Sequence, residues 1–253
     1  MPLGPYTNRT VAHVSWYGFF KLVGKGLGYS LARIDVTGRE NIPRSGPFFL
    51  IPNHQSVLDP ILVQAVCPRT VHSFTKSTQF ASPVFRWLLP RLNAIPTRRY
   101  RVDPQVVRVA LRLVEEGRGI GIYPEGERSW DGSLQPLRRG TVRLLLKAGA
   151  PVVPCGVVGS YDVWPRWSRR PRRCGVSIRF GKPLHFGKHD EKSDRERALD
   201  GAIARLARAL EDLVGPDQPS GATAGLSGSP SPDGGFVTRP PKGAKTGALA
   251  PEL

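Results

Sequence analysis

A histidine and an aspartate stand five positions apart in the stretch IPNHQSVLDP, which covers residues 51–60. On a continuous helix, positions five apart differ by ~140° in direction, so His54 and Asp59 would not meet there. Pro60 predicts instead that a helix starts here, with Asp59 at its N-cap and His54 in the preceding loop. If the loop folds back onto the cap, the carboxylate accepts the Nδ1 hydrogen and leaves Nε2 unprotonated. The pair then predicts a general base for a substrate hydroxyl, although Asp before Pro is also a common cap.

A second charged turn, YPEGERSWDG at residues 123–132, follows the β-rich run GIGIY. In a parallel sheet, ligands bind outside the carboxyl ends of the strands. We therefore expect Glu125, Gly126 and Arg128 to project onto the same side of the sheet as His54. This arrangement would bring an acidic and an arginine side chain to the edge that holds the predicted base.

An arginine cluster follows a third β-rich run, NAIPT at residues 93–97. Its members are Arg98, Arg99 and Arg101, with a tyrosine between the last two. Arginine side chains present forked N–H groups that suit phosphate. The cluster therefore predicts phosphate binding at the same sheet edge, and a solvated loop is the plainer alternative.

The elements that must position these residues follow an alternating pattern from about Ile34 onward. Strands are expected at 47–51, 71–74, 93–97, 119–123, 151–159 and 176–180. Helices are expected at 60–66, 83–89, 104–116 and 140–148, and a last helix begins at a capping box formed by Ser193 and Glu196. Strands that alternate with helices of this length predict an α/β domain, with a mostly parallel sheet flanked by helices.

Composition divides the chain into three segments. Residues 1–33 form an N-terminal amphipathic segment, in which aromatic and aliphatic side chains alternate with basic ones as in helices at a membrane interface. The alternative is a helix packed on the domain, and four glycines weaken the helix itself. Residues 34–215 form the folded domain. Residues 216–253, rich in Pro, Gly and Ser, are expected to be a disordered tail.

Charge and cysteine content limit the function classes. A net charge of +17, from 37 Lys and Arg against 20 Asp and Glu, favours nucleic acid, anionic lipid surfaces, or phosphorylated ligands and acidic carriers. Three scattered cysteines without a C-x-x-C pattern argue against a zinc site or a disulfide framework and fit a reducing compartment. There is no signal-peptide pattern and no uncharged apolar run of ~18–20 residues. We expect neither export nor a membrane span, while association with a membrane surface stays open.

Four stretches together resemble the sequence blocks of the glycerolipid acyltransferases, the 1-acylglycerol-3-phosphate acyltransferase family. The first block, NHxSxxD, is matched by NHQSVLD at 53–59, and the second, G-x-I-P-V-D-R, by LNAIPTRR at 92–99. The third, F-P-E-G-T-R-S, is matched by YPEGERS at 123–129, and the fourth, V-P-V-V-P-V-A, by APVVPCG at 150–156. The blocks occur in the family's order, and the similarity covers roughly residues 34–185.

The resemblance implies transfer of a fatty acyl group from acyl-CoA or acyl carrier protein to the sn-2 hydroxyl of 1-acylglycerol-3-phosphate, which gives phosphatidic acid. His54 would be the general base and Asp59 its orienting partner. Arg99 matches the arginine that holds the acceptor phosphate. The third block, which is associated with acceptor binding, contributes Glu125, Gly126 and Arg128. A thioester is already reactive, so no metal and no cofactor beyond the acyl donor are expected.

Three positions depart from the family pattern. Asn93 stands where the second block usually has Gly, and Arg98 stands where it often has Asp. Glu127 replaces the small Thr of the third block and adds a carboxylate beside the phosphate site that the resemblance implies. The acceptor is therefore less defined than the reaction, and another lysophospholipid or a glycolipid is the alternative within the family.

The partners that follow are an anionic membrane surface, a lysophosphatidic acid-type acceptor, and acyl-CoA or acyl carrier protein. We expect a peripheral location on the cytoplasmic face of a membrane, and the basic-aromatic stretch at 163–173 is either part of that contact or a solvated loop. A basic nucleic-acid-binding protein is the rival of another class, yet no helix-turn-helix, zinc-finger or RNP pattern supports it. An esterase would need a nucleophile such as Ser56, whose spacing from His54 is poor for that role.

Overall fold

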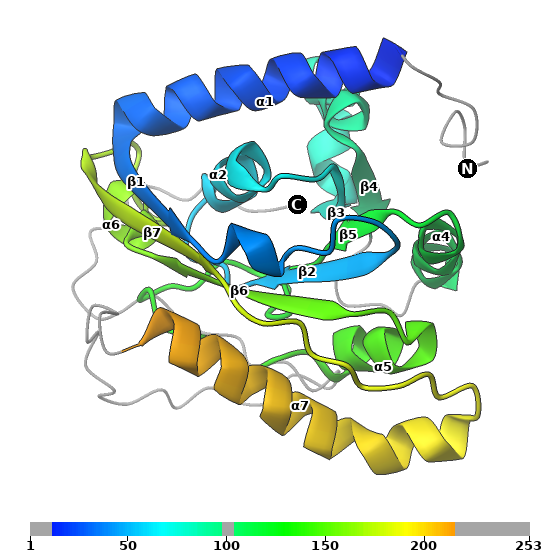
Figure 1. Ribbon diagram of the computed structural model, residues 1–253. Helices are drawn as coiled ribbons and strands as arrows, with labels where there is room; N and C mark the ends of the chain where they lie inside the picture. Colours follow the sequence, from blue (N-terminus) through cyan, green and yellow to red (C-terminus); the bar gives the residue numbers. More distant parts are fainter. Residues whose placement is uncertain (1–11, 98–103, 216–253) are drawn as a thin grey trace.

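Figure 1 shows the computed structural model, which describes residues 12–97 and 104–215. Seven strands form one sheet in the order β1-β7-β6-β2-β5-β3-β4. Their bounds are β1 Ala32–Thr37, β2 Phe48–Pro52, β3 Val71–Lys76, β4 Ala94–Thr97, β5 Gly119–Gly121, β6 Val152–Val158 and β7 Cys174–Phe180. Neighbouring strands are parallel except for β6 and β7, which pair antiparallel. The mostly parallel α/β sheet is therefore confirmed.

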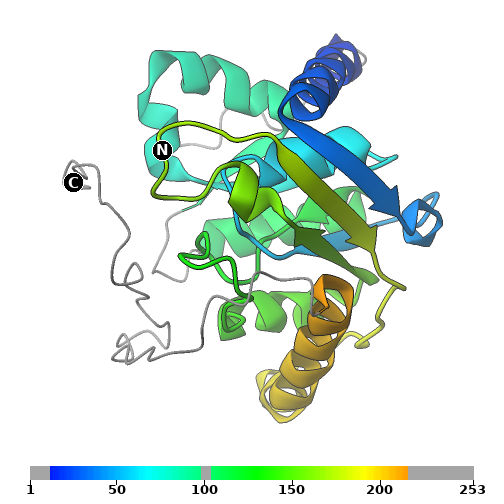
Figure 2. The ribbon, with the colours of Figure 1, turned by 90° about the vertical axis from the view of Figure 1, so that its left-hand side faces the viewer.

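Helices cover both faces of this sheet. They are α1 Ala12–Leu31, α2 Asp59–Val66, α3 Pro83–Leu88, α4 Pro104–Glu115, α5 Arg139–Ala148, α6 Ser160–Val163 and α7 Lys192–Val214, with 3-10 turns at Arg39–Asn41, Ser77–Ala81 and Leu89–Leu92. α2 lies on one face with α1 crossing outside it, and α5 and α7 lie on the other face (Figure 1). Figure 2 shows α1 and α7 on opposite sides of the sheet.

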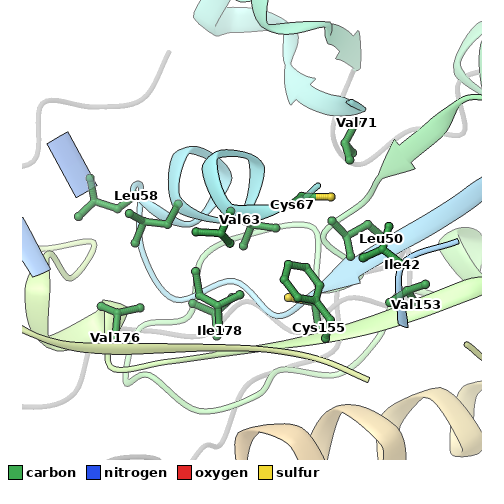
Figure 3. Close-up of a cluster of buried hydrophobic side chains, with 14 of the residues drawn as sticks. Ile42, Leu50, Leu58, Val63, Cys67, Val71, Val153, Cys155, Val176 and Ile178 are labelled. Carbon is green, nitrogen blue, oxygen red and sulfur yellow. The ribbon is translucent and has the colours of Figure 1, made fainter. Parts of the chain in front are cut away.

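β2 is the central strand, and all five of its residues are buried. Side chains alternate between the two faces of a strand, so Phe48 and Leu50 join the core under α2, while Phe49 and Ile51 join the core under α5 and α7. A strand buried on both faces carries a continuous apolar run, which explains the sequence FFLI. In Figure 3, Leu58 and Val63 of the α2 region face side chains of β6 and β7 across this core.

α1 packs on α2 through one side only. Tyr17 is buried, and its hydroxyl donates to Gln64 Oε1 at 3.3 Å. A Cβ on Gly28 would lie 2.6 Å from Leu62 Cδ2, so glycine permits the close approach of the two helices. Two of the four glycines counted against the helix, Gly24 and Gly28, are thus part of its packing, whereas a Cβ on either of the other two would meet no described residue within 4 Å. None of the described helices combines the length and apolar character that crossing a membrane requires.

Three local expectations are wrong. β1 is an edge strand that the apolar runs do not predict, and its first two residues fall within the predicted amphipathic segment 1–33. α2 begins at Asp59 with Leu58 at the N-cap, because loop N–H groups occupy the Asp59 carboxylate. The capping box of α7 does not form: the helix begins at Lys192, and the Glu196 carboxylate instead accepts from Arg143. The predicted tail, 216–253, lies outside the described residues.

Candidate active site

The strand order brings two of the predicted stretches together. β2 and β5 are neighbours and parallel, so the loops that follow them leave the same edge of the sheet side by side. The backbone N–H of Ser129 donates to the carbonyl of His54 at 2.8 Å and joins the two loops. On the other side of β2, the side-chain amide of Asn53 bonds both the N–H and the carbonyl of Val157, at 2.6 and 2.9 Å. The His54 loop is therefore fixed from both sides.

His54 and Asp59 meet as predicted. His54 Nδ1 lies 2.8 Å from Asp59 Oδ2, and the loop between them folds back onto the start of α2. The same oxygen accepts the backbone N–H groups of Gln55 and Ser56, each at 2.7 Å. Asp59 is 0% exposed, so three donors hold its carboxylate in one orientation. A neutral imidazole that donates its Nδ1 hydrogen to this carboxylate has an unprotonated Nε2.

Tyr123 is a contact of the histidine that the sequence analysis misses. Its ring centroid lies 4.2 Å from that of His54, with the two planes inclined at 32°. Burial raises the pKa of the Tyr123 phenol well above its usual value, with a further contribution from the negative charge of Asp59. The uncharged Tyr123 ring therefore packs against one face of the imidazole. The signal available in the sequence was an aromatic residue at the end of the β5 run.

Glu125 connects the third stretch to the histidine loop. Its carboxylate accepts the backbone N–H of His54 at Oε1, 2.7 Å, and that of Gln135 at Oε2, 3.0 Å. The residue is 4% exposed. Burial raises the pKa of Glu125 well above its usual value, against the lowering effect of the two N–H groups. These contacts hold the backbone of His54 in place, and a part for Glu125 in acceptor binding stays a prediction.

Gly126 and Arg138 form the turn next to Glu125. Gly126 has φ 77°, and a Cβ there would lie 1.9 Å from Arg138 Nε. Arg138 Nε donates to the carbonyl of Glu125 at 2.9 Å. Glycine is thus required both by the left-handed backbone and by the guanidinium packed against it. Arg138 is a cation of the site that no local sequence pattern selects, because it lies 13 residues beyond Glu125.

Of the two remaining predicted cations, the structure describes Arg128 but not Arg99. Arg128 is half-buried within the turn that follows β5. Arg99 lies outside the described residues, just beyond the end of β4 at Thr97. β4 is separated from β5 by β3, so its carboxyl end is two strands away from the β5 turn. Within 12–97 and 104–215, no group of three His, Cys, Asp or Glu side chains is arranged to hold a metal ion.

The comparison with known proteins decides the family. A profile described as Acyltransferase matches residues 33–158, which include β2, β5, β6 and the turns with His54 and Glu125. The chain belongs to the acyltransferase family. It is 31% identical over 173 residues to a chloroplast 1-acyl-sn-glycerol-3-phosphate acyltransferase of Brassica napus, a match that covers 67% of this chain and 50% of that protein. The chain therefore spans about half the length of this relative.

Matches to two further acyltransferases extend over a larger share of those proteins. The 1-acyl-sn-glycerol-3-phosphate acyltransferase of Bacillus subtilis is 27% identical over 188 residues, which are 71% of this chain and 91% of that one. The crystal structure of the 1-acyl-sn-glycerophosphate (LPA) acyltransferase from Thermotoga maritima superimposes with a TM-score of 0.66 at 22% identity, over 82% of this chain and 84% of that chain. The second match establishes the fold.

Asn93, a departure from the second acyltransferase block, has a physical explanation. It adopts φ 54° and ψ 32°, the left-handed conformation, and caps the 3-10 turn Leu89–Leu92 before β4. Among the described residues it is the one non-glycine with positive φ. Asn is among the non-glycine residues that tolerate this conformation best, which explains how it can stand where the family usually has Gly.

The esterase alternative finds no support at Ser56. Its hydroxyl is buried and donates to the carbonyl of Trp164 at 2.7 Å, while accepting the N–H of Leu58. A serine nucleophile would instead donate to the histidine base. Ser56 therefore serves to connect the first acyltransferase block to the loop that begins at Trp164.

Proposed function

We propose that this chain transfers a fatty acyl group from an acyl thioester to the sn-2 hydroxyl of 1-acylglycerol-3-phosphate, and so forms phosphatidic acid. The observation that carries the proposal is the 2.8 Å contact between His54 Nδ1 and Asp59 Oδ2 at the carboxyl end of β2. The acceptor follows from the relatives, whose names specify 1-acyl-sn-glycerol-3-phosphate.

The proposed reaction needs one base and no covalent enzyme intermediate. His54 Nε2 removes the proton from the acceptor hydroxyl as its oxygen attacks the thioester carbonyl carbon. The tetrahedral intermediate then collapses, the C–S bond breaks, and the imidazolium returns the proton to the departing thiolate. Asp59 stabilises the imidazolium and keeps the ring oriented. The donor is acyl-CoA or acyl carrier protein, and no cofactor takes part.

We assign the acceptor phosphate to the cations around the β5 turn and after β4. Arg99 and Arg128 would bind the phosphate oxygens, because guanidinium groups match phosphate geometry. Gly126 would let the backbone approach the head group. Glu125 would act mainly through His54, since each of its oxygens already accepts a backbone N–H.

An exposed apolar surface supports a place at a membrane. Its side chains are between 36% and 69% exposed, and they come from α1, the loop before α2, the first turn of α2, and α3: Phe19, Leu22, Val23, Leu27, Tyr29, Val57, Ile61, Val84, Phe85 and Trp87. The edge-to-face contact of Phe20 with Trp87, at 6.1 Å between centroids, joins α1 to α3. Val57 follows His54 by only three residues, so this surface reaches the proposed base.

Surfaces of this kind bind a partner or a lipid interface. With a net charge of +17, a bilayer with anionic lipids is the partner that satisfies both features. We propose that the apolar surface lies in the interface of the cytoplasmic face, where the acyl chain of the lysolipid acceptor resides. The protein would then act as a peripheral membrane enzyme.

The test is a thiol-release assay with oleoyl-CoA, in the presence and absence of lysophosphatidic acid. Wild-type protein should release thiol only with the acceptor, and His54→Ala should lose this release by about 10²–10⁴-fold. His185→Ala, an exposed histidine far along the chain, is the matched control and should keep full activity. Release without an acceptor would indicate a thioesterase, and an active His54→Ala protein would refute the proposed base.

The phosphate assignment is tested in the same assay. Arg99→Ala should raise the KM for lysophosphatidic acid about tenfold while the KM for oleoyl-CoA stays the same, because a charged hydrogen bond contributes ~1.5–3 kcal/mol. An unchanged KM for the acceptor would remove Arg99 from the phosphate site without affecting the proposal for His54.

A further inference from the structure

The acid that this chain adds to the third acyltransferase block has a specific partner. Glu127 Oε2 accepts from Arg166 Nη1 at 3.1 Å, and the two side chains are only 15% and 18% exposed. The Arg166 guanidinium also lies 4.0 Å from the centroid of the Trp130 ring. An ion pair this far from solvent and stacked on an indole is a defined structural unit, unlike most surface pairs.

Arg166 belongs to a loop outside the four blocks, the segment 164–173 between α6 and β7. Trp164 accepts the Ser56 hydroxyl at one end of this loop. Further along the loop, Trp167 Nε1 donates to the hydroxyl of Tyr161 in α6 at 3.1 Å, and that hydroxyl donates to the carbonyl of Trp130 at 2.9 Å. The loop is therefore attached both to the His54 loop and to the β5 turn.

These contacts correct one alternative for the stretch 163–173. Its first half is packed into the site and is not a solvated loop, while Arg169, Arg170, Arg172 and Arg173 remain exposed. Arg98, the other added charge among the departures from the family pattern, lies outside the described residues. The partner that the structure provides for Glu127 is Arg166.

We propose that Arg166 is a specificity residue for an anionic acceptor head group, because it neutralises Glu127 beside the site that binds the acceptor phosphate. The inference rests on the proposed function. Glu127 lies between Gly126 and Arg128 in the sequence, and we assign both of these neighbours to that site. An unpaired carboxylate at this position would repel a phosphate, whereas the pair restores the neutrality that Thr gives in other family members. Arg166 acts through Glu127, so it is a positioning residue.

The neighbouring carboxyl groups agree with this electrostatic role. Burial is the main cause that raises the pKa of Glu125, and the negative charges of Asp59 and Glu127 raise it further. The field of Glu127 thus reaches the carboxyl that holds His54. Removing Arg166 would leave this field uncompensated in a poorly solvated turn, where one charge has a large effect.

The experiment compares two acceptors across a double-mutant cycle. KM and kcat are measured with oleoyl-CoA and either lysophosphatidic acid or the uncharged 1-monoacylglycerol, for wild type, Arg166→Ala, Glu127→Thr and the double variant. Arg166→Ala should raise the KM for lysophosphatidic acid about tenfold and leave the KM for monoacylglycerol and for oleoyl-CoA within about twofold. Glu127→Thr in the same protein should restore the low KM, since it removes the charge that Arg166 balances.

Two further variants separate charge from packing. Arg166→Lys keeps the charge and should retain a KM within about threefold of wild type, which covers the case in which Arg166→Ala does not fold. Arg169→Ala, an exposed arginine of the same loop, should change neither KM.

Other results overturn the inference in distinct ways. An equal rise in KM for both acceptors, or a double variant as impaired as Arg166→Ala, would show that Arg166 acts only by packing the loop. Wild-type transfer to lysophosphatidic acid with an unaltered KM in Arg166→Ala would refute the inference alone. Absence of transfer from the wild type to any lysolipid would refute the proposed function, and the inference with it.

Discussion

Two regions on the same side of the molecule invert the usual distribution of side chains. Around Asp59, polar and charged groups are buried: Asn53, His54, Gln55, Ser56 and Glu125 are all less than 9% exposed. On α1 and α3, large apolar side chains are exposed instead, with Leu22 at 69% and Val84 at 68%. Buried polar groups and exposed apolar patches are the informative deviations in a folded protein.

The two regions differ in what offsets their unfavourable free energy, which comes from buried polar groups in one and exposed apolar groups in the other. In the buried region, hydrogen bonds within the chain satisfy nearly every polar atom. Among the described residues, Asp59 Oδ1 is the only buried side-chain nitrogen or oxygen without a hydrogen-bond partner. The apolar surface has no such internal compensation, because nothing in the described chain covers it. The buried region is therefore expected to depend on its internal contacts, and the apolar surface on a lipid partner.

Asp59→Asn should have the largest effect. Asn can place its oxygen where Oδ2 accepts three hydrogens, and its NH2 group then replaces the unpartnered Oδ1. The fold should persist with a loss of about 1–3 kcal/mol for a buried donor without an acceptor. Transfer should fall by about 10²–10⁴-fold, because the imidazolium loses its counter-charge. Denaturant unfolding and the thiol-release assay measure the two quantities separately.

Asp35→Asn, on the exposed edge strand β1, is the control and should change neither quantity. If Asp59→Asn retained wild-type transfer at unchanged stability, the buried region would be a structural network with no part in the chemistry.

Substitutions on the apolar surface should give the opposite result. Leu22→Glu combined with Val84→Glu removes apolar contact from α1 and α3 at positions that touch no core cluster. Each apolar side chain contributes ~1.5 kcal/mol to interfacial burial, so binding to vesicles with anionic lipid should weaken about 100-fold. The melting temperature should stay within a few degrees. Vesicle co-sedimentation and thermal unfolding, measured on the same preparation, check both statements.

Ala204→Glu, exposed on α7 across the sheet, is the matched control for an added carboxylate. Undiminished sedimentation of the double variant would mean that the apolar surface serves something other than lipid. Deleting residues 1–33 would be a poorer test, since it also removes the packing of Tyr17 and Gly28 against α2.

The sequence was sufficient where a local pattern determines the structure. Strand ends could be located from apolar runs, and the positions of His54, Asp59 and Glu125 just after those ends predicted that they share one edge of the sheet. It was insufficient where segments distant in the sequence make contact. Tyr123 against His54 and Arg166 against Glu127 depend on strand order and loop path, which no local periodicity encodes.

The same distinction explains the smaller errors. The motif of Ser193 and Glu196 is a correct local signal, but Arg143 of α5 competes for the Glu196 carboxylate with contacts at 2.7 and 2.9 Å. Likewise, glycine has an unfavourable helix propensity, and the packing of Gly24 and Gly28 against α2 offsets it in α1. In both cases a tertiary contact overrides a local preference.

Glu125→Gln should produce the smallest effect and show whether the buried region carries a charge. Burial raises the pKa of Glu125 in the folded protein, so the native state binds this proton more tightly than the unfolded chain does. Its contribution to stability is then present at low pH and is lost as pH rises from ~4.3, the unfolded value, through the folded pKa. Glutamine does not titrate, and it can accept only one of the two N–H groups.

The difference in unfolding free energy between wild type and Glu125→Gln should therefore fall with rising pH, by at most about 1.4 kcal/mol per pH unit. Urea unfolding of both proteins from pH 4.5 to 8 measures this difference. Parallel stability curves would mean that the carboxyl ionises normally despite its burial, so that the two N–H groups of His54 and Gln135 compensate the whole cost of burying it. The hydrogen bonds of the buried region would then stabilise an ionised carboxylate as well as water does, and they alone would hold the His54 loop in its conformation.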